Sequence, residues 1–220
     1  AGCNDIRLSH SICCRNNAIT TLSNPGSENG YIEAHLDNTL SLCDNSPRFI
    51  ENTTIKICNG QHSFINFAAY DPDGDSLVYS LIDCREGYNN IVEYNAGFNG
   101  TNPFTTAAGV SINPQNGIVS LIPISRQVSI ICVRVDEYRN GVKIGETIRD
   151  IQVLVENCNN SAAPPLMVQN DTTICSGSTV TLTVNPTVTQ GLDSIVWWPT
   201  FQNGQIINVS PNQTSIYTVR

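Results

Sequence analysis

The sequence predicts an all-β protein, organised as tandem β-sandwich modules and stabilised by disulfides. Only 14% of the 220 residues are charged, and the abundant Asn, Ser and Thr side chains suit strands and turns better than helices. Short runs of branched and aromatic residues recur between turn signals along the chain. The nine cysteines include no Cys-x-x-Cys pair, which indicates disulfides in an oxidising compartment rather than zinc ligation.

Residues 1–44 contain two strand-like runs, Asp5–Ile12 and Tyr31–Leu36, separated by a turn-rich stretch at 23–27. This segment looks too short to fold as a domain. We therefore expect residues 1–44 to complete a sandwich whose earlier strands lie upstream of Ala1. No signal-peptide pattern opens the chain, so we expect a mature chain or a fragment and favour a fragment.

Residues 45–160 have the pattern of one β-sandwich, because strand-like runs alternate with turn signals at short intervals. The Asn140-Gly141 pair is the strongest hairpin signal in the chain and joins the last two of these runs. The predicted strands of this unit span 52–57, 62–70, 77–82, 91–94, 109–113, 118–122, 128–138 and 143–156.

A short stiff linker at 161–165 precedes a second unit over 166–220, since its adjacent prolines favour an extended backbone. Val180–Val184 alternates cleanly, Ile195–Trp198 supplies a large aromatic core residue, and 215–219 forms a further strand-like run. In this unit Cys175 comes before one strand, Trp197 or Trp198 lies in the middle, and Tyr217 lies in the strand near the end. This order suggests an immunoglobulin-like sandwich that lacks its last strand.

The turn between two apolar runs carries three carboxylates at alternate positions, Asp71, Asp73 and Asp75. Oxygen ligands spaced in this way on a tight loop suit Ca²⁺. Gly74 comes too early, and Ile82 stands where a helix-loop-helix calcium loop needs a bidentate Glu, so an EF-hand is excluded. We expect a structural Ca²⁺ site of modest affinity, with Glu137 as an extra ligand. The alternatives are a metal-free acidic hairpin turn and a solvent-exposed Glu137.

Strand order predicts two disulfides in the first unit, Cys84 with Cys132 and Cys58 with Cys158. Cys3, Cys13, Cys14 and Cys43 are left to pair among themselves or upstream. Adjacent residues of a strand point to opposite faces, so Cys13 and Cys14 should take different partners. Cys175 is expected to pair with a residue beyond Arg220.

Charge and motif content exclude several function classes. A net charge of −8 and a pI near 4.7 argue against nucleic acid, whose phosphates require a basic surface. The sequence contains no run of 18 apolar residues, so no membrane span is predicted. The three histidines lie far apart with no nucleophile motif beside them, so we expect no enzyme activity.

Several motifs resemble those of gliding-motility-associated surface adhesins of the Bacteroidota, which are large repeat proteins exported by type 9 secretion. The motifs are Cys13–Asn16, Tyr31–Ala34, Asn45–Phe49, Asp71–Tyr79, Val133–Gly141 with Arg149–Val153, Asp171–Ser178 and Ser210–Val219. The resemblance implies a cadherin-like first module and a PKD- or immunoglobulin-like second module. It further implies an adhesive or structural role at the extracellular cell surface, with neighbouring repeats or subunits of the same filament as partners.

Three tripeptides contain an acidic, a hydroxyl-bearing and an apolar residue in that order. This order matches a sequence pattern used for O-glycosylation in the Bacteroidota. The tripeptides place candidate acceptors at Ser76, Thr172 and Ser194. In the case of Ser76, the preceding Asp75 is also expected to serve the acidic turn.

A carbohydrate-binding accessory module of a secreted enzyme is the alternative, since sandwiches with bound Ca²⁺ are also usual in that class. Such a module would bind surface glycans through an exposed row of aromatics, for which Tyr88, Tyr94, Phe98 and Phe104 are the candidates. Packing of these side chains into a core is the competing interpretation.

Overall fold

The computed structural model describes residues 5–41, 43–50, 55–158, 166–168, 172–186, 195–200 and 202–219. Over these residues the protein is all-β, as predicted, with a single 3₁₀ turn, η1 (Pro25–Ser27). Two compact units are present, Ala1–Cys158 and Asn159–Arg220. Within the described part of the chain, no helix has the length and hydropathy needed to cross a bilayer.

A long hairpin forms the centre of the first unit and consists of β12 (Gln127–Arg139) and β13 (Val142–Glu156). Its turn residues, Asn140 and Gly141, have φ angles of 53° and 79°. A type I′ turn requires this left-handed backbone at both central positions, and Asn-Gly is the pair that adopts it most readily. The predicted hairpin is therefore confirmed.

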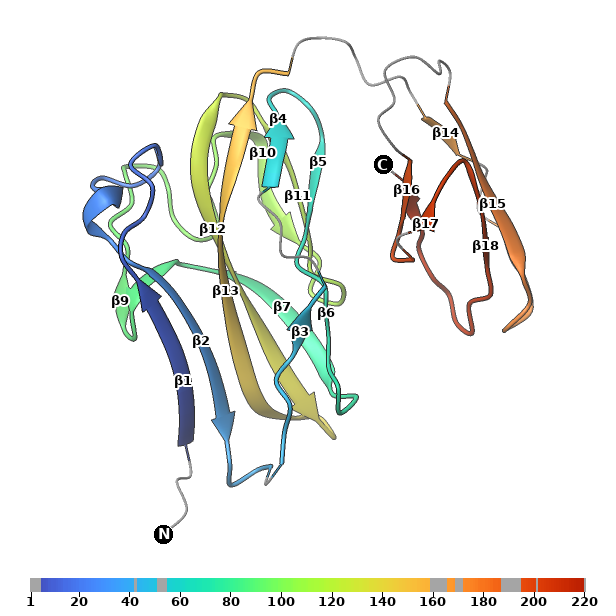
Figure 1. Ribbon diagram of the computed structural model, residues 1–220, viewed down its shortest axis with the longest axis horizontal. Coiled ribbons are helices and arrows are strands. Elements are labelled where there is room, and N and C mark those ends of the chain that lie inside the picture. The colour runs from blue at the N-terminus through green and yellow to red at the C-terminus, as the bar shows by residue number, and fades with distance from the viewer. Residues whose placement is uncertain are drawn as a thin grey trace. The chain divides into compact units, whose positions relative to one another are not determined.

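The hairpin is extended on both sides into a six-stranded sheet (Figure 1). On one side β13 pairs with β2 (Gly30–Asp37), which pairs in turn with the edge strand β1 (Asp5–Ile12). On the other side β12 pairs with β7 (Ser76–Ile82). The end of β13 also runs parallel to β4 (Ile55–Cys58).

The pairing of β2 with β13 corrects the expectation that residues 1–44 complete a sandwich upstream of Ala1. In the structure Leu36 pairs with Gly145 and Glu33 with Ile148, so the N-terminal hairpin extends the sheet of the first unit. Local sequence patterns show where a strand lies but do not identify its partner, which explains the error.

A second, three-stranded sheet contains β10 (Thr106–Ile112), β11 (Ile118–Pro123) and β5 (Ser63–Asn66). The main core draws buried side chains from both sheets, including Ile65 and Val119 from this sheet and Val133 and Val153 from the hairpin. Alternate residues of β11 are buried, as expected for a strand with one face on a core.

Two short ladders complete the first unit. One pairs β3 (Arg48–Phe49) with β6 (Ala69–Tyr70), and the other pairs β8 (Arg85–Gly87) with β9 (Asn90–Ile91). The predicted strand at 62–70 is thus broken into β5 and β6, because the Asn66 side chain accepts a hydrogen bond from the Ala68 N–H and bends the chain. The predicted strand at 91–94 is confined to Ile91.

The second unit has two small sheets. The first joins β14 (Leu166–Val168), β15 (Val180–Pro186) and β18 (Ile206–Val209), and the second joins β16 (Val196–Trp198), β17 (Gln202–Asn203) and β19 (Thr218–Val219). Trp197 is the buried aromatic of this unit, and its indole N–H donates to the Gly204 carbonyl at 2.8 Å. The predicted linker at 161–165 lies outside the described residues.

Among the described residues three disulfides are present, and two of them are those that the strand order predicts. Cys58 at the end of β4 is bonded to Cys158, two residues after β13, and Cys84 is bonded to Cys132 of β12. The register explains both pairs, since Cys58 lies opposite Glu156 and Cys132 lies opposite Ile82.

The third disulfide joins Cys13 to Cys14, so the prediction that these residues take different partners is wrong. That prediction assumed the alternation of a strand, but β1 ends at Ile12 and both cysteines lie in the loop that follows. Cys43 and Cys175 are exposed and have no disulfide partner among the described residues. Cys3 lies outside those residues, and the partner of Cys175 beyond Arg220 stays a prediction.

We expect that replacing Cys58 and Cys158 together by serine lowers the free energy of unfolding by about 2–4 kcal/mol. The bridge closes a long loop and restricts the unfolded chain. Denaturant titration under non-reducing conditions measures the change. Cys175→Ser, at an exposed and unbridged position, is the control and should leave the midpoint unchanged. A double variant as stable as the parent would contradict the prediction.

Candidate metal centre

Five carboxylates gather where the β6–β7 turn meets the hairpin and the loop after β2. Two overlapping triads, Asp44–Asp75–Glu137 and Asp71–Asp73–Asp75, each place one oxygen per residue within 4.8 Å of the others. The structure therefore brings together all four residues predicted as calcium ligands. It adds Asp44, which the sequence analysis missed.

The turn is held in place by Tyr79 and by its own backbone. The Tyr79 hydroxyl accepts from the Ala69 N–H at 2.9 Å and donates to the Ala69 carbonyl, which fixes the start of β7 against β6. Gly74 has a φ of 85° and donates its N–H to the Asp71 carbonyl. Strands β6 and β7 belong to different sheets, so this is a crossing turn and not the hairpin turn considered from the sequence.

Arg139 is the cation within this acidic cluster. Its Nε and Nη2 donate to the two oxygens of Asp75 at 2.9 and 2.5 Å, and Nη2 also reaches Asp44 at 2.9 Å. Nη1 donates to the Ser41 hydroxyl at 2.6 Å and to the Cys43 carbonyl at 3.1 Å. The guanidinium thus ties the end of β12 to the loop after β2.

Asp71 and Asp73 are bound differently. One oxygen of Asp71 accepts the N–H groups of Asp73 and Asp75 at 2.8 and 3.0 Å. The other oxygen is buried, and the Asp71 carboxyl is a hydrogen-bond partner of Glu137. Asp73 accepts the Asn45 N–H at 2.7 Å and the Asn45 side-chain amide at 3.0 Å. These bonds lower the pKa of the Asp73 carboxyl.

Glu137 is the buried member of the cluster, with an exposed fraction of 1%. The alternative that Glu137 is a solvent-exposed side chain beside the hairpin is therefore wrong. The physical reason is the absence of a side chain at Gly145, which faces Glu137 across the hairpin. A Cβ at Gly145 would lie 2.9 Å from the Glu137 carboxylate and 2.9 Å from the His35 carbonyl.

Burial, the nearby Asp44 carboxylate and the hydrogen bond with Asp71 together raise the pKa of Glu137 to about 9. Burial also raises the pKa of Asp44, although Arg139 opposes that shift. The hydrogen bonds to Asp75, together with the nearby Asp44 and Asp73 carboxylates, hold the pKa of Arg139 above its ordinary range. The site is therefore short of positive charge despite its one guanidinium.

The sequence offered only a weak signal for the additional members of the site. Asp44 precedes the Asn45–Phe49 motif and Arg139 precedes the Asn-Gly turn, but no spacing rule connects residues that lie so far apart in the chain. Gly145 reads in sequence as an ordinary glycine within a strand. Only the sheet register places it opposite Glu137.

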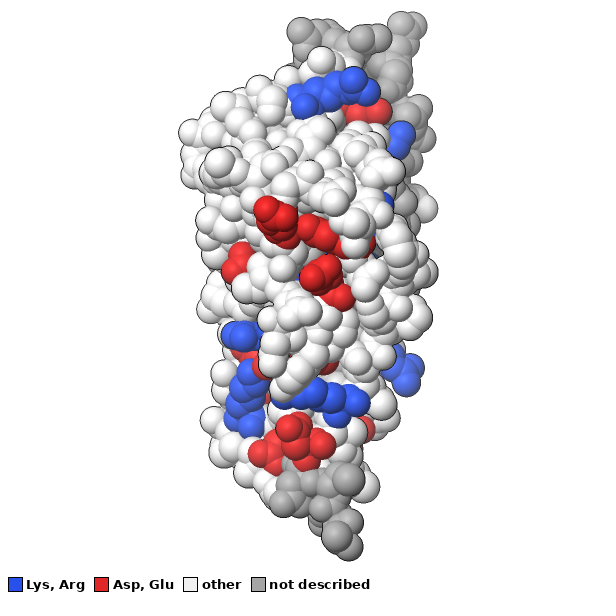
Figure 2. Space-filling model, turned by 90° about the vertical axis from the view of Figure 1, so that its left-hand side faces the viewer, with Lys and Arg blue, Asp and Glu red and all other residues white. Residues whose placement is uncertain are grey.

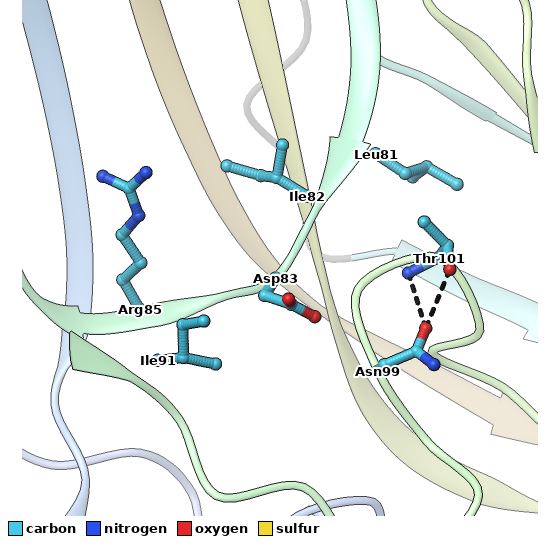
Figure 3. Close-up of a pocket in the computed structure, with 7 residues that line it drawn as sticks. All are labelled: Leu81, Ile82, Asp83, Arg85, Ile91, Asn99 and Thr101. Atoms are coloured by element: carbon cyan, nitrogen blue, oxygen red, sulfur yellow. Dashed lines mark hydrogen bonds between the residues drawn. The ribbon is translucent and has the colours of Figure 1, made fainter. Parts of the chain in front are cut away.

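A second feature is a shallow hollow of about 480 Å³ at the end of β7 (Figure 3). Its polar lining residues are already engaged within the protein. Asp83 accepts the Gly100 N–H at 2.6 Å, and Asn99 accepts two bonds from Thr101, both at 2.9 Å. Arg85 donates to the Tyr88 carbonyl at 3.2 Å.

The aromatics expected to form a glycan-binding row do not lie together on the surface. Phe104 is fully buried in the main core. Tyr94 packs against the smaller cluster around Cys84 and Cys132, and burial raises the pKa of its hydroxyl to about 12. Phe98 is half-buried, and Tyr88, the exposed member of the four, has Arg7 over its ring, so the expected row is wrong.

The remaining candidate positions are the hydroxyls predicted as glycosylation acceptors. Ser76 and Thr172 are both exposed, and Ser194 lies outside the described residues. Ser76 opens β7 directly after Asp75, whose carboxylate is bound by Arg139. Modification at these positions stays a prediction.

The exposed surface agrees with the low charge of the sequence. Figure 2 shows one face on which the charged side chains are few and gather in small clusters, with uncharged surface between them. That face has no broad basic area of the kind that a phosphate backbone requires.

A scan against protein-family models found no match, and a search of curated proteins found none either.

With divalent cations chelated, the pKa of Glu137 predicts that stability falls as pH rises. Its pKa is raised from 4.5 to about 9, so the folded state holds a proton that the unfolded state releases. The stability from this group is complete below pH 4.5 and is lost between about pH 4.5 and 9, by at most about 1.4 kcal/mol per pH unit.

Denaturant unfolding of the parent and of Glu137→Gln between pH 5 and 9 measures this contribution. The difference in unfolding free energy between the two proteins should change steadily with pH, whereas Glu93→Gln, at an exposed carboxylate, should follow the parent. Parallel pH profiles for Glu137→Gln and the parent would contradict the assignment.

Proposed function

We propose that this chain is a structural or adhesive module of a large extracellular filament or stalk at the cell surface. The observation that carries the proposal is the Cys58–Cys158 disulfide, which lies where the chain leaves the first unit. Disulfides persist in oxidising compartments, and this one is placed where tension along a stalk would enter the unit.

The disulfide diverts such tension away from most of the first unit. Force applied at Cys158 passes through the bridge to Cys58 and continues toward the N-terminus. The closed loop has a sequence separation of 100 residues and includes β5 through β13. Under load, the two-sheet core within this loop cannot be extended while the bridge is intact.

The resemblance to repeat-built surface adhesins of the Bacteroidota supports the same function. Two consecutive all-β units suit a chain of repeats, and a low surface charge is compatible with close packing of neighbouring repeats. Linkage to surface adhesion or gliding motility follows from the resemblance alone and is part of this proposal. Cadherin-like and immunoglobulin- or PKD-like folds are likewise proposed for the two units.

A carbohydrate-binding accessory module is the less favoured alternative. The burial of Phe104 and Tyr94 removes the stacking surface expected of that class. The polar side chains of the hollow in Figure 3 already bond to protein groups. A glycan array on the native chain is the direct test, and strong binding that Asn99→Ala abolishes would favour this alternative.

Surface labelling of intact cells tests the proposed location and assembly. A membrane-impermeant reagent should label the native protein, and its intact mass should lie well above the 23.9 kDa of this chain. Protection from the reagent, or a native monomer of 23.9 kDa, would overturn the proposal.

Single-molecule extension between the two ends tests the load path. We expect unfolding of the oxidised first unit to exclude the loop closed by Cys58 and Cys158. Reduction should release an additional length of about 330–360 Å, at about 3.3–3.6 Å per residue. Without reductant the Cys58→Ser/Cys158→Ser variant should show about 170–190 Å of this gain, because the Cys84–Cys132 bridge inside the loop still closes 48 residues. Equal extension before and after reduction would refute the shielding of the core.

A further inference from the structure

The N-terminal hairpin of β1 and β2 has an apolar face that the second sheet of the first unit leaves uncovered. Val135 of β12 lies opposite Thr147 of β13, which lies opposite Ala34 of β2. Ala34 in turn lies opposite Leu8 of β1. Opposed residues of antiparallel strands point to the same side of a sheet, so Leu8 is on the side where Val135 enters the main core. Val135 is fully buried, whereas Leu8 is 71% exposed.

We call this side of β1 and β2 the bare face. It carries the even-numbered residues of both strands, and His10 is its one side chain with polar atoms. The opposite side carries the charged residues, and Arg7 is paired there with Glu33. Such segregation is typical of strands with one covered and one solvated face. On the bare face, however, four large aliphatic side chains are at least 36% exposed: Ile6, Leu8, Ile12 and Ile32.

Strand β1 also has a free edge. Its eight residues pair with β2, and no strand of the described chain pairs with its other side. β1 contains neither Pro nor Lys, the residues with which natural proteins often protect a sheet edge. Its Arg7 is directed back to Glu33 of β2. Both the bare face and the edge beside it are therefore accessible to a partner.

The chemistry of the bare face selects a partner that is apolar and uncharged over the same length. A charged partner would lose its hydration there without gaining a counter-ion. A second copy of this chain meets the requirement, because about a two-fold axis the same face meets itself. Two such hairpins can stack about 10 Å apart, as the two sheets of a β-sandwich do.

The shape of the first unit also suits a second copy. The first sheet is broader than the second, so the second sheet ends as a step beside the bare face. Figure 1 shows β5, β10 and β11 on one side of β13, and β1 and β2 on the other. When a second copy lays its β1 and β2 on those of the first, its own second sheet lies in the layer of the first copy's β1, beside the free edge.

We propose that the bare face of β1 and β2 binds the same face of a second copy of this chain, so that two N-terminal hairpins complete a β-sandwich between neighbouring copies. The inference deepens the proposed function, since it names the surface through which copies in a filament contact one another.

The size of the bare face makes this a weak contact. Two strands of eight residues, at about 3.3 Å per residue and about 4.8 Å between strands, present about 250 Å² of sheet per copy. Stable complexes of free proteins bury about 1,200–2,000 Å², so the contact alone does not hold two dilute chains together. Linked neighbours are present at an effective concentration of about 1 mM. The occupancy of the contact therefore rests on the proposed filament.

Sedimentation equilibrium of the full chain at rising concentration tests the contact. The parent should form a dimer with a Kd of about 1 mM or below, the range in which linked neighbours would be bound. Leu8→Lys should weaken the association about tenfold or more, because it places a charge within the apolar contact. Ile91→Lys, the same type of change at a 56% exposed position on β9, should associate as the parent does. A monomeric parent at about 1 mM, or parental association by Leu8→Lys, would overturn the proposal.

A photo-cross-linking amino acid in place of Leu8 identifies the occupant. In the concentrated full chain, and in native material, cross-linked peptides should join position 8 to β1 or β2 of a second copy. Cross-links to a different protein, or to another surface of this chain, would refute the choice of partner. Cross-links between the two hairpins in a protein that fails the surface-labelling experiment would support the contact and refute the filament, so the two failures are distinguishable.

Discussion

The β12–β13 hairpin is the element on which the rest of the first unit depends. Its two strands pair with each other over their whole length and provide the edges to which β2, β4 and β7 bind. Val133, Val135, Val153 and Val155 of the hairpin are fully buried in the main core. The left-handed backbone of Asn140 and Gly141 sets the register of the hairpin, and with it the neighbours of every side chain on the two strands.

The acidic cluster is a consequence of that register. Glu137 lies opposite Gly145 on one side and Leu77 on the other, so the empty position at Gly145 admits a carboxylate into a largely apolar sheet. Burying this group is costly, and the β6–β7 turn and Arg139 surround it with further charge.

The disulfides act at the ends of the same sheet. Cys132 ties β12 to the chain that follows β7, and Cys158 ties the exit of β13 to β4. Both were predictable from strand order, because long strands with clear alternation have well-defined ends. The Cys13–Cys14 disulfide could not be predicted in this way, because its prediction requires knowing that β1 ends at Ile12, directly before the two cysteines.

The all-β class, the Asn-Gly hairpin, two disulfides and the position of the acidic turn could be predicted from the amino-acid sequence. Each follows from local chemistry: side-chain alternation, the backbone preference of Asn-Gly, and the spacing of Asp71, Asp73 and Asp75. Three findings came from the tertiary structure: residues 5–37 join the first unit, Phe104 is buried, and Asp44 and Asp75, both bound by Arg139, lie beside Glu137. These findings depend on which strands pair and in what register. Strand pairing is fixed by contacts between residues far apart in the chain, and local sequence patterns carry no information about such contacts.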